Sequence, residues 1–169
     1  MAVRKYLKNN AGTITEETPA ITSAGAADEG KITALDASGR LSASFMPVGV
    51  AIETQALVAS EALAAGDWVN VWDDAGAFKC RKADATTSGK EAHGFVLAAV
   101  AAAATATVFL EGTNTALTGQ TPGVKFLSIT AGAGSATAPT AAGNVVQRLG
   151  VATSATTVNF EPSLPYVLA

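Results

Sequence analysis

Residues 66–76 read GDWVNVWDDAG, and this stretch decides the fold class. Its apolar residues alternate, so that Val69 and Val71 fall on one face of a strand and Trp68 and Trp72 on the other. The Asp-Asp-Ala-Gly that follows predicts a hairpin turn in which the last glycine takes a positive φ. Residues 77–82 then form the returning strand. We therefore expect a β-hairpin within an all-β fold.

Further strand signals lie on both sides of this hairpin. Short runs of β-branched and small residues, separated by Gly, Pro, Ser and Thr, predict strands at 51–59, 94–97, 105–110, 124–129, 145–152 and 156–161. The alanine-rich run 98–104 favours a helix on propensity alone. It is barely two turns long and no capping residue precedes it, so we expect a tight connection between strands instead.

Three segments follow from these patterns. Residues 1–50 contain only isolated large apolar residues, too widely spaced to form a core, and we interpret them as an extended N-terminal arm. Residues 51–112 form a first β unit and residues 113–169 a second. Within the arm, Asp36 and Gly39 predict a local turn.

The two β units share the order of their features. A glycine before a strand recurs at Gly66 and Gly123, and a second glycine recurs at Gly94 and Gly150. An internal duplication would give two similar small barrels or sandwiches, or one pseudo-symmetric barrel. Chance similarity between segments rich in Ala, Gly and Thr is the alternative.

The composition limits both the core and the partners. Hydrophobic residues make up 49% of the 169 residues but aromatic residues only 6%, so each unit buries a thin core and gains from association. The net charge of −3 and the absence of a basic stripe argue against nucleic-acid binding. No apolar run is long enough for a transmembrane helix, and no signal peptide opens the chain, so we expect no membrane partner.

The residue inventory also argues against catalysis. His93 is the only histidine and Cys80 the only cysteine, which excludes Cys/His metal sites and disulfides within the chain. Alternation places Cys80 on the opposite face from its cationic neighbours, as a small core residue. Asp73-Asp74 fits a turn better than a cation site. We expect no enzyme activity, no cofactor and no metal.

The chain resembles structural proteins of tailed bacteriophages. Residues 30–47, GKITALDASGRLSASFMP, resemble a linker phrase of such proteins. Residues 65–112 look like a β module that recurs in head decoration, head-fibre and tail-fibre proteins, and residues 116–161 look like a companion module. Together the three segments cover nearly the whole chain. They are moderately specific for virion proteins and weakly specific for the part of the virion.

This resemblance implies a capsid decoration, or cement, protein on the outer surface of the virion head. It also implies a homotrimer whose partner is the major capsid protein. The absence of a coiled coil or fibrous repeat favours the capsid over the tail. The expected capsid contacts lie on the arm, at Arg4, Tyr6, Leu7, Ile14, Ile21, Phe45 and Met46.

The sequence leaves two alternatives open. The basic cluster Arg4, Lys5 and Lys8 fits either a solvated terminus or an arm that docks on an acidic surface. A short head or tail fibre, or an adhesin module that binds host glycans, is the alternative function. It would use Trp68 and Trp72 as an exposed platform for sugars, whereas a structural role would bury them.

Overall fold

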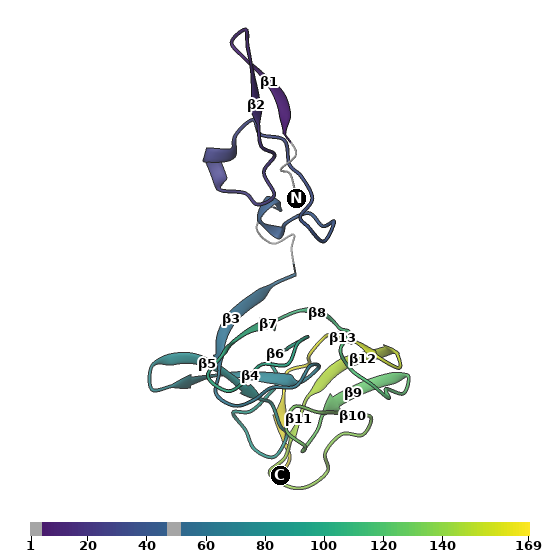
Figure 1. The fold of residues 1–169 in the computed structure, drawn as a ribbon. Coiled ribbons are helices and arrows are strands. Elements are labelled where there is room, and N and C mark those ends of the chain that lie inside the picture. Colours follow the sequence, from purple (N-terminus) through teal and green to yellow (C-terminus); the bar gives the residue numbers. More distant parts are fainter. Residues whose placement is uncertain (1–4, 47–51) are drawn as a thin grey trace. The chain divides into compact units, whose positions relative to one another are not determined.

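The computed structural model describes residues 5–46 and 52–169, and the chain divides into two compact units with the boundary between Ala51 and Ile52. Both units consist of strands and turns, and the N-terminal unit also contains two short 3-10 segments (Figure 1). The all-β class expected from the sequence is therefore confirmed.

The first half of the C-terminal unit closes into a five-stranded barrel. Its strands are β3 (Thr54–Ala59), β4 (Trp68–Asp74), β5 (Ala77–Lys82), β6 (Gly94–Phe95) and β7 (Thr105–Phe109). They neighbour one another in the order β3-β5-β4-β6-β7, and β7 returns to β3. Four of the five pairings are antiparallel, whereas β3 and β5 pair in parallel.

The β4–β5 hairpin matches the sequence prediction closely. Asp74 pairs with Ala77, so the turn has two central residues, Ala75 and Gly76. Both take positive φ, at 54° and 88°, as a type I′ turn requires. The run 98–104 contains no helix and connects strands, as expected.

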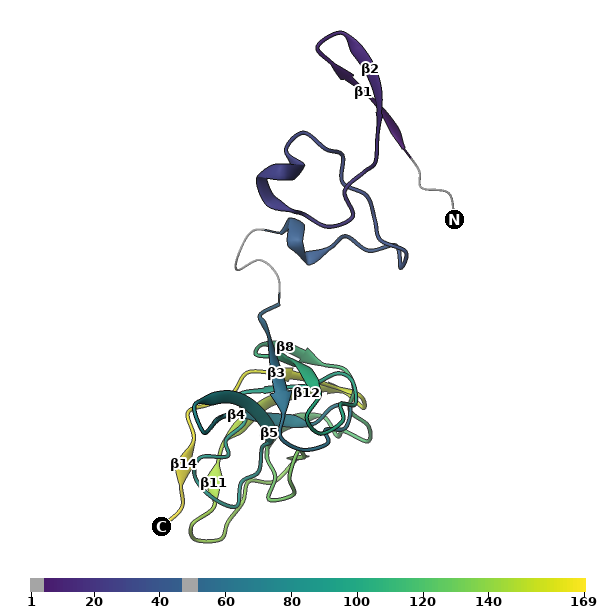
Figure 2. The same ribbon diagram turned by 60° about the vertical axis from the view of Figure 1, so that its left-hand side comes forward.

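The second half contributes an open antiparallel sheet in the order β10-β9-β12-β13-β8. Its strands are β8 (Gly112–Asn114), β9 (Gly123–Leu127), β10 (Gly134–Ser135), β12 (Arg148–Ser154) and β13 (Thr157–Phe160). A separate two-stranded ladder joins β11 (Val145–Val146) to β14 (Tyr166–Val167), next to the C-terminus (Figure 2).

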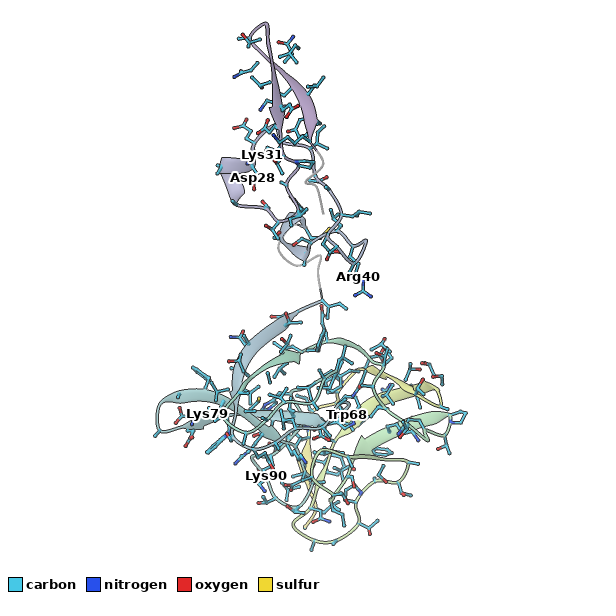
Figure 3. The ribbon with its side chains drawn as sticks, viewed as in Figure 1. Asp28, Lys31, Arg40, Trp68, Lys79 and Lys90 are labelled. Carbon is cyan, nitrogen blue, oxygen red and sulfur yellow. The ribbon has the colours of Figure 1, made fainter. Side chains whose placement is uncertain are left out.

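One aromatic core joins the two halves. The Trp68 indole lies 5.7 Å from the Phe95 ring and 5.2 Å from the Phe160 ring, centroid to centroid. Leu127 and Leu149 from the second half are fully buried in the same cluster. Trp68 therefore stands near the middle of the unit (Figure 3). The structure does not show the duplication, because one half closes as a barrel and the other stays an open sheet.

The interior of the barrel is a second, thinner core. It consists of small and aliphatic residues without an aromatic ring: Leu57, Ala59, Leu63, Val69, Cys80, Val96, Ala106 and Val108. Val69 lies in this cluster and Trp68 in the aromatic core, so the alternation predicted for β4 is confirmed.

The N-terminal unit is a hairpin followed by turns. Its hairpin pairs β1 (Tyr6–Asn10) with β2 (Thr13–Glu17) across a turn at Ala11 and Gly12. Two 3-10 segments follow, η1 (Gly25–Asp28) and η2 (Ala43–Phe45). The arm expected as extended thus contains a hairpin and ordered turns. In the predicted turn, the Asp36 carboxylate accepts hydrogen bonds from the main chain of Ser38 and Arg40.

Candidate functional site

The two faces of the β1–β2 hairpin differ in what they contact. Residues opposite each other in an antiparallel ladder share a face, so Tyr6, Glu17, Lys8 and Thr15 lie on one side. On this side the Lys8 ammonium pairs with Glu17 at 3.2 Å. The Tyr6 hydroxyl accepts a hydrogen bond from the main chain of Ile32 at 3.3 Å. This face of the hairpin is therefore hydrogen-bonded to the rest of the N-terminal unit.

The opposite face of the hairpin carries apolar side chains in solvent. Leu7 and Ile14 are diagonal neighbours there, and their side chains are 71% and 59% exposed. The Lys5–Glu16 ion pair, at 3.0 Å, lies beside them. We call Leu7 and Ile14 the hairpin patch. This apolar pair stays exposed on a short, regular sheet.

The described part of the N-terminal unit has no core. Within residues 5–46, not one residue is buried. Hydrogen bonds and ion pairs hold the turns instead, such as the 2.8 Å contact between the Lys31 ammonium and Asp28. This side-chain hydrogen bond lowers the pKa of the Asp28 carboxyl and raises that of Lys31. The large apolar side chains left exposed are Leu7, Ile14, Ile21, Ile32, Leu35, Leu41 and Met46.

The residues expected to contact a capsid differ in how exposed they are. Arg4 lies outside the described residues. Tyr6 and Phe45 are half-buried within the unit, whereas Ile21 and Met46 are exposed. Leu7 and Ile14 come together in the hairpin patch. The pairing of Leu7 with Glu16, and of Asn9 with Ile14, explains this, and the β-propensity of residues 13–17 could have signalled it.

Three exposed residues were not among the predicted contacts, namely Ile32, Leu35 and Leu41. Ile32 lies next to a parallel bridge between Ala20 and Thr33. The main chain of Ala20 donates to Ile32 and accepts from Ala34, both at 2.9 Å. This bridge fixes the backbone and leaves the Ile32 side chain in solvent. In the sequence, only the apolar character of these three residues marked them as possible contacts.

An apolar hollow of about 400 Å³ opens at one end of the barrel. Its walls are the side chains of Gln55, Leu57, Val71, Phe78 and Leu110. Gln55 is the only polar residue in this set, and no charged residue belongs to it. The Phe78 side chain is 75% exposed, which is unusual for an aromatic residue on a strand.

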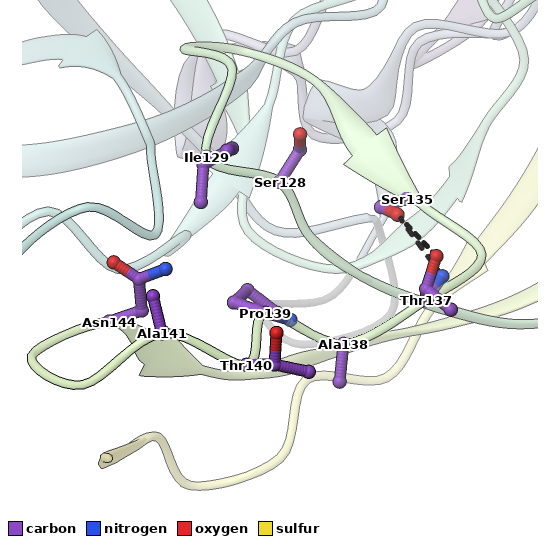
Figure 4. A pocket seen from close by; sticks show the side chains of 9 residues that line it. All are labelled: Ser128, Ile129, Ser135, Thr137, Ala138, Pro139, Thr140, Ala141 and Asn144. Atoms are coloured by element: carbon purple, nitrogen blue, oxygen red, sulfur yellow. Dashed lines mark hydrogen bonds between the residues drawn. The ribbon is translucent and has the colours of Figure 1, made fainter. Parts of the chain in front are cut away.

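A second hollow, of about 270 Å³, lies on the other half of the unit (Figure 4). Its lining mixes hydroxyl groups, apolar side chains and one amide, with no charged residue: Ser128, Ile129, Ser135, Thr137, Ala138, Pro139, Thr140, Ala141 and Asn144. The Ser135 and Thr137 hydroxyls lie 3.5 Å apart. We call this the hydroxyl hollow. Its neutral lining suits an uncharged polar ligand better than an ion.

The tryptophans of β4 do not form an exposed pair. Trp68 is 1% exposed in the aromatic core. Trp72 is half-buried, its indole N–H donates to Ser60 Oγ at 3.0 Å, and the Arg81 guanidinium stacks 4.5 Å from its ring centre. One ring is therefore inaccessible and the other is covered on one side. The exposed sugar platform considered as the alternative is therefore absent from this strand.

The groups considered for chemistry have structural partners. Cys80 is fully buried in the barrel, as predicted, and burial raises the pKa of its thiol. His93 is exposed, and its Nδ1 accepts a hydrogen bond from the Val71 main chain at 3.1 Å. Asp74 pairs with Lys79 at 2.6 Å. In the described parts of the chain, no three His, Cys, Asp or Glu residues gather as metal ligands.

Asp84 is the buried carboxylate of the unit. Burial raises the pKa of this carboxyl, but hydrogen bonds from Thr86 and Lys90 together outweigh burial and hold it below its usual range. The Lys90 ammonium lies 3.0 Å from Asp84. These contacts order the loop at residues 83–92, so we assign Asp84 a structural role.

Within residues 5–46 and 52–169, no helix has the length and apolar character to cross a bilayer. The chain matches no known protein family, no curated protein and no solved structure.

Proposed function

We propose that this chain is a structural virion protein, a capsid decoration protein that binds the outer surface of a phage head and stabilises it. One observation carries the proposal: residues 5–46 form ordered strands and turns but bury no residue. Such a segment gains apolar burial only against another surface. The resemblance of residues 30–47, 65–112 and 116–161 to tailed-phage structural proteins suggests that this surface is the major capsid protein.

In the proposed mechanism the hairpin patch is the central contact. Leu7 and Ile14 lose their exposure against the capsid, while the face that carries Tyr6 keeps the hairpin attached to its own unit. Binding to the assembled head, and not to free subunits, stabilises the head by mass action. The role requires binding only, in agreement with the structural partners of Cys80 and His93.

Co-sedimentation with phage heads that lack the protein tests this proposal. The double variant Leu7→Ser/Ile14→Ser should bind heads about 100-fold more weakly than the wild type, because two aliphatic side chains lose their burial. Its thermal unfolding should match the wild type, since neither residue is buried in the free chain.

The matched control is Leu164→Ser/Val167→Ser, which removes two exposed apolar side chains from the C-terminal tail. It should bind heads like the wild type. Wild-type protein that fails to sediment with heads would refute the proposal, as would full binding by the hairpin variant.

The hydroxyl hollow favours a second candidate function, an adhesin module that binds neutral glycans. The side-chain oxygen and nitrogen of the buried amides both make internal hydrogen bonds in Asn70, Asn114 and Gln147. Asn144, in contrast, lines the hollow and has no side-chain hydrogen bond to another described residue. Binding on a glycan array that Asn144→Ala abolishes would support this candidate, and an array without hits would remove it.

A further inference from the structure

The apolar hollow exists because two strand ladders separate at one end of the barrel. β3 and β5 pair only at Val58–Lys79 and Ala59–Cys80. The β4–β5 ladder continues past this point to Asp74–Ala77, and the β3–β7 ladder continues to Thr54–Phe109. The barrel wall therefore opens between β3 and β5.

The walls of this opening come from both ladders. Gln55 and Leu57 stand on β3, while Val71 and Phe78 stand on the β4–β5 hairpin. Phe78 is two residues before Cys80, so its side chain is on the interior face of β5. The barrel interior behind it has no aromatic ring to fill the opening.

The Phe78 ring and an apolar hollow that could hold such a ring thus lie side by side on one patch of the surface. Phe78 is 75% exposed, and it borders an apolar hollow of about 400 Å³ with no charged residue in its walls. A patch that holds both a knob and its hole is self-complementary, which is what a two-fold contact between identical chains requires.

We propose that the opening between β3 and β5 is a self-association site, in which Phe78 of one copy enters the hollow of another. In a two-fold pair, the Phe78 ring of each copy fills the hollow of the other. The inference rests on the proposed assembly function and deepens it by naming a second copy as partner. Self-association can be tested without a capsid, so self-association and capsid binding can each be refuted independently of the other.

The walls of the hollow favour this occupant over others. A charged peptide would leave its charges unpaired among Leu57, Val71 and Leu110. Each chain carries one Phe78 ring and one hollow, so a second copy supplies the occupant without any further ligand. An aromatic side chain from another copy would also bury more apolar surface against the thin barrel core than a smaller side chain could.

Sedimentation velocity of the full chain at about 50 μM tests the site, since this concentration detects micromolar association. Wild-type protein should be a dimer. Phe78→Ser should weaken association by about 100-fold. Gln55→Trp, which fills the hollow with the chain's own indole and keeps Phe78, should weaken it as well.

Val124→Ser is the control, because it removes an exposed apolar side chain on β9, outside the patch. It should associate like the wild type. A monomeric wild type would overturn the inference, even if the hollow binds an apolar dye. A wild-type oligomer that persists in both Phe78→Ser and Gln55→Trp would overturn it too.

Discussion

The side-chain amide of Gln147 and the main chain of Ala92 form a reciprocal pair of hydrogen bonds. The Ala92 N–H donates to Oε1 at 2.8 Å, and Nε2 donates to the Ala92 carbonyl at 2.9 Å. Both residues are buried, and 55 positions separate them in the chain. The amide acts like one rung of a β-ladder and ties the loop at residues 83–92 to the second half of the unit.

Gln147→Leu should therefore destabilise the protein by about 3 kcal/mol, because it leaves a buried donor and a buried acceptor without partners. Chemical denaturation measures this free energy of unfolding. Gln120→Leu is the control, since the Gln120 amide makes only an exposed hydrogen bond to Thr118. It should change stability by less than about 0.5 kcal/mol. Equal effects of the two substitutions would contradict the assignment.

Gly150 occupies a position that no other residue fits. It lies at a bulge of β12 with φ at 147°, and a Cβ there would lie 1.8 Å from the Asn159 carbonyl oxygen. Gly150→Ala should cost more than about 3 kcal/mol of stability or prevent folding. Gly143 also has a positive φ but no atom within 4 Å of its missing Cβ, so Gly143→Ala should cost only about 1 kcal/mol. Thermal unfolding of both variants distinguishes steric clash from backbone strain.

Asp84 should make stability depend on acidic pH. Its pKa is lower in the folded chain than in the unfolded chain, so the folded state gains stability above the ordinary carboxyl pKa. This stability is lost as the pH falls through the lowered pKa. Asp84→Asn should be less stable than the wild type at neutral pH, and the difference should shrink towards strongly acidic pH. A constant difference across the acidic range would count against this assignment.

Cys80 should act at the opposite end of the pH range. Burial raises the pKa of its thiol, so the unfolded chain releases the proton at a lower pH than the folded chain. Stability should fall as the pH rises through the ordinary thiol pKa, and Cys80→Ala should remove that part of the fall. Native protein should also react slowly with a thiol reagent that labels the unfolded chain at once. Rapid labelling of the native protein would show that the thiol is accessible.

Amide hydrogen exchange should separate the two units. The amides of the β1–β2 hairpin should exchange faster than those of β4 and β12, because residues 5–46 have no buried residue to resist opening. On bound heads the hairpin amides should become protected. Hairpin amides as slow as those of β4 in the free chain would indicate a stability that this unit lacks.

Local signals in the sequence predicted local structure well. The alternation at 68–72 and the Asp-Asp-Ala-Gly turn specify the β4–β5 hairpin, because both act over a few residues. The burial of Cys80 followed from the same alternation. The turn at Asp36 was likewise predictable from its carboxylate and from Gly39.

Long-range features were not predictable in this way. Neither the parallel pairing of β3 with β5 nor the amide of Gln147 on Ala92 leaves a local mark in the sequence. The apolar hollow depends on where the β3–β5 ladder stops, and only the tertiary structure sets that point. The arm was recognisable from its lack of a core, whereas the hairpin patch required the register of Leu7 and Ile14.

Cryo-electron microscopy of virions that carry this chain tests the central claim most directly. The account predicts density for residues 52–169 on the outer surface of the head, with the hairpin patch of Leu7 and Ile14 against the major capsid protein. Density on the tail alone, or a bound chain whose hairpin patch still faces solvent, would contradict it.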